Sequence, residues 1–77
     1  MKSFLYIDAD TNLEFENISK AFRYVHSKGL TSYIVLTKYP HSQTVSVYNP
    51  FLVSDWPVEY LKSESEALKY IGSFLVA

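Results

Sequence analysis

The sequence predicts an α+β fold, with two helices over about 17–28 and 64–75 packed on one face of a small antiparallel sheet of three to five strands. Three observations lead to this fold. Two stretches carry apolar residues at helical spacing, and two β-branched, aromatic runs flank a short loop to form a central hairpin over 32–48. The length of 77 residues, of which 48% are hydrophobic, suits one domain spanning 1–77.

The N-terminal third reads as two strands and a helix. Residues 2–7 are predicted to form a strand, and the Asp- and Asn-rich stretch 8–12 has turn chemistry. Residues 13–16 alternate apolar and acidic side chains, which fits a short second strand. The first helix is expected to begin at Asn17, a good N-cap residue, and to end at Gly29, where a left-handed C-cap belongs.

The central hairpin joins two runs that are typical of strands. Residues 32–39 and 44–48 are rich in β-branched and aromatic side chains, and Pro40 through Gln43 forms a loop between them. Farther along, residues 58–61 are predicted to form a short edge strand.

The second helix has a capping box at its start, because Ser63 is followed by Glu66. Gly72 weakens this helix but need not end it. If the helix did end at Gly72, residues 73–76 would form a strand, and a ferredoxin-like βαββαβ order would be the alternative fold.

The two helical segments resemble each other without gaps, residues 17–27 matching 63–73. Two interpretations are open: capped amphipathic helices look alike, or a strand–helix unit is duplicated. The aligned tyrosines lie on the same flank of each helix, so on a shared face they would line one ridge. The identical pairs are Ser19/Ser65, Ala21/Ala67, Tyr24/Tyr70 and Ser27/Ser73.

Catalytic chemistry is sparse. The absence of cysteine excludes disulfides and thiolate chemistry, and two glycines allow no Gly-rich phosphate loop. An apolar strand followed by Asp8-Ala9-Asp10-Thr11 resembles the first motif of haloacid dehalogenase-like phosphatases, which implies a nucleophilic Asp8, an acid/base Asp10 and bound Mg²⁺. That family also uses a distal Lys and an acidic pair on a much larger fold. No adjacent acids follow Asp10, so we expect a polar turn, no enzyme, no cofactor and no metal site.

Aromatic side chains, by contrast, are abundant, with seven Tyr, five Phe and one Trp. The apolar segment 49–61 contains two prolines, so it either covers the open end of the core or forms an exposed, adhesive patch. Tyr and Trp are enriched at the energetic centres of protein interfaces. The residues expected to contact a partner are Trp56, Tyr60, Phe51, Tyr39 and Tyr48.

These features predict a small non-catalytic protein-binding module, an inhibitor or regulator that masks a partner's surface. A phage-type inhibitor would fit the size, and a homodimer formed through 49–61 would use the same patch. With no apolar run of 18 residues and no signal segment, we expect a cytoplasmic protein that does not enter membranes.

The alternative function is weak single-stranded nucleic-acid binding by the segment 20–48. Residues 17–54 contain no acidic side chain, and basic residues alternate there with tyrosines that could stack on bases. The net charge of −1 and only four cations in this segment make such binding weak, and nucleic acid is the less favoured partner. The basic residues concerned are Lys20, Arg23, Lys28 and Lys38.

Overall fold

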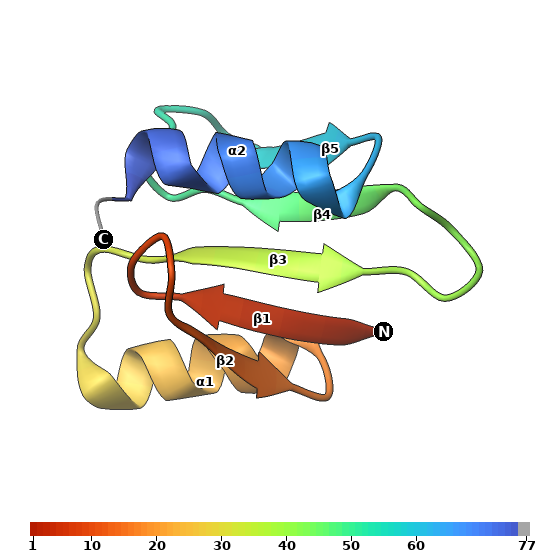
Figure 1. The fold of residues 1–77 in the computed structure, drawn as a ribbon. Helices are drawn as coiled ribbons and strands as arrows, with labels where there is room; N and C mark the ends of the chain where they lie inside the picture. The colour runs from red at the N-terminus through yellow and green to blue at the C-terminus, as the bar shows by residue number, and fades with distance from the viewer. Residues whose placement is uncertain (76–77) are drawn as a thin grey trace.

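The computed structural model describes residues 1–75, which form a five-stranded antiparallel sheet and two helices (Figure 1). The strand order across the sheet is β2-β1-β3-β4-β5. The predicted α+β fold, the central hairpin and the short edge strand at 58–61 are therefore confirmed. In chain order the elements are β1 (Lys2–Tyr6), β2 (Asn12–Phe15), α1 (Ile18–Lys28), β3 (Ile34–Lys38), β4 (Val45–Tyr48), β5 (Val58–Leu61) and α2 (Glu64–Phe74).

The two helices lie on opposite faces of the sheet, so the prediction that they share one face was wrong (Figure 1). Successive side chains of a strand point to opposite faces. On the central strand β3, Val35 packs with α1, whereas its neighbours Ile34 and Leu36 pack with α2. A strand buried on both faces needs an unbroken apolar run, which β3 has. We call the side covered by α1 face A and the side covered by α2 face B.

Each face has its own small core. Under α1, Leu5 and Val35 from the sheet meet the fully buried Ala21. Under α2, Leu36 and Val47 meet the equally buried Ala67. An alanine at the helix–sheet contact lets the helix backbone lie close to the sheet.

The chain consists of two ββα units, β1-β2-α1 and β4-β5-α2, placed on either side of β3. Val58 of β5 follows Asn12 of β2 by 46 residues (58 minus 12), and Glu64 of α2 follows Ile18 of α1 by the same 46 (64 minus 18). Because the units occupy opposite sides of β3 and opposite faces, β3 acts as a pseudo-two-fold axis. The duplicated-unit interpretation of the sequence is thereby supported.

Local hydrogen bonds repeat between the units as well. Asn17 and Ser63 both accept a bond from the backbone N–H three residues later. Ser27 Oγ donates to the carbonyl of Tyr24, as Ser73 Oγ does to that of Tyr70. Because the helices are on opposite faces, the two tyrosines do not line one ridge.

The helix ends follow from their sequences. Gly29 ends α1 with φ of 64°, and its N–H donates to the carbonyl of His26. Gly72 lies inside α2, which continues to Phe74, so the ferredoxin-like alternative with a strand from residue 73 is wrong. Residue 76, the last residue of that alternative strand, lies outside the described residues. Among residues 1–75, no helix is long and apolar enough to cross a membrane.

Candidate protein-binding surface

Each helix covers only about half of its face. On face A, α1 contacts β1, β2 and β3, while on face B, α2 contacts β3, β4 and β5. Two patches of sheet therefore have no helix above them. We call the β4–β5 part of face A, with Tyr39, the open patch of face A, and the β1–β2 part of face B the open patch of face B.

The open patch of face A is built around Ser46. Ser46 lies opposite Tyr60 in the β4–β5 register, and the Tyr39 hydroxyl donates a hydrogen bond of 2.9 Å to its Oγ. Ser46 is buried although no helix covers it, while Tyr60 is 59% exposed. In this patch the Tyr60 ring is exposed to solvent, and the neighbouring Ser46 hydroxyl is already hydrogen-bonded to Tyr39.

Tyr48, two residues along β4 from Ser46, connects this patch to α1. The Phe22 ring of α1 meets the Tyr48 ring edge-on, with 4.9 Å between centroids. Tyr33 stacks on the other side at 6.4 Å. Burial, with a smaller contribution from the neighbouring Tyr48, raises the pKa of Tyr33 above its ordinary value.

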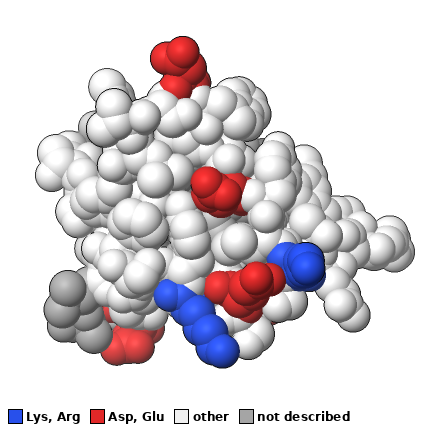
Figure 2. All heavy atoms as spheres, turned by 90° about the horizontal axis from the view of Figure 1, so that it is seen from above, with Lys and Arg blue, Asp and Glu red and all other residues white. Residues whose placement is uncertain are grey.

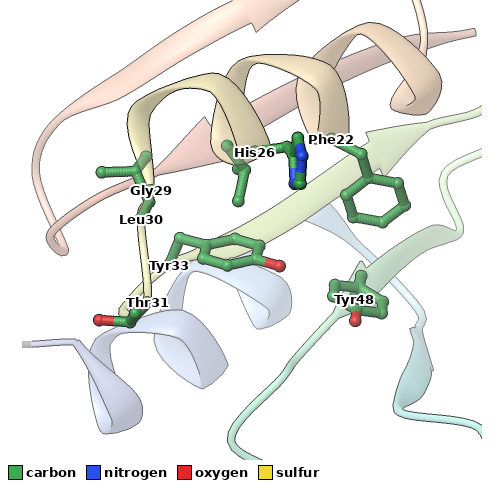
Figure 3. Close-up of a pocket in the computed structure, with 8 residues that line it drawn as sticks. Phe22, His26, Gly29, Leu30, Thr31, Tyr33 and Tyr48 are labelled. Atoms are coloured by element: carbon green, nitrogen blue, oxygen red, sulfur yellow. The ribbon is translucent and has the colours of Figure 1, made fainter.

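A cleft of about 530 Å³ lies between α1 and this part of the sheet (Figure 3). Phe22 and His26 of α1 form one side, and Tyr33 and Tyr48 form the other.

The loop from 49 to 57 is held by Asn49, which is completely buried. Its Nδ2 donates to the Tyr70 hydroxyl at 3.0 Å, and its Oδ1 accepts from the Phe51 N–H at 3.0 Å. Its own N–H donates to the carbonyl of Pro57 at 2.8 Å. These bonds close the loop and turn Phe51 onto α2, where it stacks on Phe74 at 6.1 Å.

Trp56 is the most exposed of the predicted contact residues, at 68%. Its backbone is fixed, since its N–H donates to Ser54 Oγ and its carbonyl accepts from the Val58 N–H. Because this backbone is already ordered, a partner that covers the exposed indole orders only its side chain.

The structure thus divides the five predicted contact residues. Tyr39, Tyr48 and Tyr60 come together on the open patch of face A, Phe51 lies against α2, and Trp56 stands on the loop between β4 and β5. Segment 49–61 buries Asn49 and packs Leu61 against the core of face B, yet it exposes Phe51, Trp56 and Tyr60.

Sequence reasoning missed Phe22 and Tyr33. Phe22 aligns with Leu68 in the repeat, but its contact with Tyr48 depends on which face α1 covers.

Charge separates the two open patches. On face B, Lys2 pairs with Glu14 at 2.7 Å, and Lys38 Nζ lies 4.9 Å from the Phe4 ring centre and 2.7 Å from Glu64. By contrast, residues 39–54 contain no Lys, Arg, Asp or Glu. Seen from above, the surface shown in Figure 2 is mostly uncharged, with separate acidic and basic side chains between the uncharged residues.

The basic residues of segment 20–48 do not converge. Lys38 lies on face B, whereas Lys20 pairs with Glu16 and Lys28 Nζ lies over the Tyr24 ring at 5.8 Å, both on α1.

The predicted polar turn is also visible. Asp8 Oδ1 accepts a bond of 2.8 Å from the Asp10 N–H, which lowers the pKa of Asp8. Within residues 1–75, no three His, Asp or Glu side chains gather to hold a metal ion. Comparison of the chain with protein-family models, curated proteins and solved structures finds no significant match.

Proposed function

We propose that the chain is a non-catalytic protein-binding module that acts as an inhibitor or regulator by masking a surface of its partner. The observation that carries this proposal is the difference between two equivalent patches. Ion pairs and a lysine shield the open patch of face B, while the paired residues of the open patch of face A, Ser46 with Tyr60 and Tyr48 with Val58, are uncharged. Uncharged aromatic surface with fixed backbone is what protein interfaces use at their centres.

The proposed role sets how much of the surface a partner would cover. A stable interface takes about 800 Å² from each partner, which is roughly a sixth of the 5076 Å² accessible surface of the described chain. The open patch of face A, the edge of β5 and the loop carrying Trp56 adjoin one another and can be covered together. A partner bound there would contact Tyr60 and Trp56 first, since both are more than half exposed.

The test uses the internal repeat as its control. Glu14 on β2 corresponds to Tyr60 on β5, because both precede their helices by the same spacing. The wild-type chain and the Tyr60→Ala, Trp56→Ala and Glu14→Ala variants are used for affinity purification from the native host. The captured protein is then purified and titrated calorimetrically. Hot-spot truncation costs at least about 2 kcal/mol, so Tyr60→Ala and Trp56→Ala should weaken binding at least ~30-fold, and Glu14→Ala should change it less than ~2-fold.

Equal effects of Tyr60→Ala and Glu14→Ala would contradict the proposal, as would the absence of any protein that binds the purified chain. Sedimentation equilibrium of the chain alone distinguishes a second copy from a different partner. If the wild type is a dimer that Tyr60→Ala dissociates, the surface masked is that of the chain itself. Binding of single-stranded oligonucleotides at low salt that Tyr60→Ala leaves intact would favour the nucleic-acid alternative.

A further inference from the structure

We infer that the cleft beside the open patch of face A receives a neutral aromatic side chain, Trp or Tyr, from the protein partner; this inference rests on the proposed function. The cleft adjoins that patch directly, because Tyr48 belongs to both. Its volume of about 530 Å³ falls within the range of roughly 300–1,000 Å³ found for ligand sites. A partner covering Tyr60 would therefore have this recess within the same interface.

The walls of the cleft suit a flat ring. Phe22 and Tyr48 meet edge-on, and Tyr33 and Tyr48 stack, so three aromatic rings surround the opening (Figure 3). Val25 and Leu30 add aliphatic surface. Aromatic rings gain from offset and edge-to-face contacts beyond the area that they bury, which an aliphatic side chain cannot match.

The polar groups of the cleft favour a neutral occupant with one hydrogen-bonding atom. No Lys, Arg, Asp or Glu lines it, so a carboxylate or ammonium group would meet no Lys, Arg, Asp or Glu of opposite charge there. The hydroxyls of Thr31, Tyr33 and Tyr48 can donate and accept. The cleft also lies at the C-terminal end of α1, and the last carbonyls of a helix have no donor within the helix. An indole N–H or phenol O–H provides such a donor, and a carboxylate does not.

The chemistry of the cleft is tested with N-acetyltryptophanamide, a neutral probe, in an NMR titration of the isotope-labelled chain. N-acetylleucinamide and indole-3-acetate serve as aliphatic and anionic controls. A ligand of this size should bind with a dissociation constant of order 1 mM. The shifts should centre on Gly29, Thr31 and Tyr33. Equal binding of N-acetylleucinamide, tighter binding of indole-3-acetate, or shifts elsewhere would overturn the inference.

A matched pair of variants ties the cleft to the partner. Thr31 lines the cleft and Ser32 does not, and both are exposed, so Thr31→Trp should fill the recess while Ser32→Trp leaves it open. Thr31→Trp should weaken both probe and partner at least ~10-fold, since the loss of one anchoring ring costs more than 1.4 kcal/mol. Circular dichroism checks that both variants fold.

The two proposals can fail separately. If Tyr60→Ala abolishes partner binding but Thr31→Trp does not affect it, the cleft is not the anchor site and the proposed function stands. If Tyr60→Ala leaves partner binding unchanged, the proposed function fails, and the probe titration with Thr31→Trp still decides whether the cleft takes aromatic rings.

Discussion

The two ββα units share a backbone plan but differ in the surface they leave open. Where the first unit places Glu14 on β2, the second places Tyr60 on β5; where β1 has Phe4, β4 has Ser46. Lys2 pairs with Glu14, and Lys38 reaches over Phe4, so the apolar residue of face B is sheltered by charge. On face A the corresponding position is a serine bonded to Tyr39.

This difference teaches that the fold itself does not require an adhesive patch. In the first unit, ion pairs cover the equivalent part of the sheet, and natural proteins commonly protect exposed sheet edges with charged side chains. The second unit has no such charges between residues 39 and 54 and carries a connecting loop four residues longer, 49–57 against 7–11. Its open patch is therefore a property of the sequence, which is why we assign function to this half.

The largest expected effect tests whether the two units form one cooperative structure. Ile71 of α2 is fully buried against the sheet, and Ile71→Ala should lower the free energy of unfolding by about 2–5 kcal/mol through lost burial and a new cavity. A chain of this length has about 4–12 kcal/mol of stability in all. Urea unfolding, followed by far-UV circular dichroism and by Trp56 fluorescence, measures the change.

Because β3 serves both cores, the two signals should shift together. Leu68→Ala, at an exposed position of the same helix, is the control and should cost less than ~1 kcal/mol. If the urea midpoint of the Trp56 fluorescence fell while that of the far-UV circular dichroism did not change, the two units would unfold independently. The comparison between them would then lose its structural basis.

The next effect concerns the loop that distinguishes the second unit. In the first unit the N–H of Ile7 bonds to the carbonyl of Thr11, and in the second that of Asn49 bonds to Pro57. The Asn49 side chain also bonds to Tyr70 and to the Phe51 N–H, whereas Ile7 has no polar side chain. Asn49→Ala should lower the free energy of unfolding by about 1–3 kcal/mol, because buried polar groups lose their partners.

Asn49→Asp is the informative companion, since it keeps the acceptor for the Phe51 N–H but loses the donor to Tyr70. Hydrogen exchange of the Phe51 amide should accelerate in Asn49→Ala more than in Asn49→Asp. Unchanged exchange in both would mean that the backbone bonds alone hold the loop.

Much of the fold could be predicted from the sequence because its signals are local. Asn17, Gly29 and the Ser63–Glu66 pair fix the helix ends, and the apolar runs of β3 and β4 fix the hairpin. The side of the sheet on which each helix packs is not local. Amphipathic helices show which of their own faces is buried, and only the unbroken apolar run of β3 indicates burial on both sides of the sheet.

The same limit applies to the candidate site. Trp56 and Tyr60 stand out by residue type and turned out to be exposed. The cleft requires Phe22 and Tyr48, 26 residues apart (48 minus 22), to meet across face A, which depends on the placement of α1. Phe51 resembled Trp56 in sequence, yet the bond from its N–H to Asn49 turns it toward Phe74 instead.

The smallest expected effect tests whether charge closes the open patch of face B. In Lys38→Met the side chain still covers Phe4, but the contacts with its ring and with Glu64 lose their charge. The free energy of unfolding should fall by about 0.5–1 kcal/mol at low salt, and by less at high salt, because exposed ion pairs are screened. Lys69→Met, on the exposed side of α2, makes the same change in net charge and should have little effect.

Should Lys38→Met match the wild type at both salt concentrations, the methylene stem alone would shelter Phe4. The two open patches would then differ in shape and ring content, and the difference in charge would no longer support the proposal that the partner binds at face A.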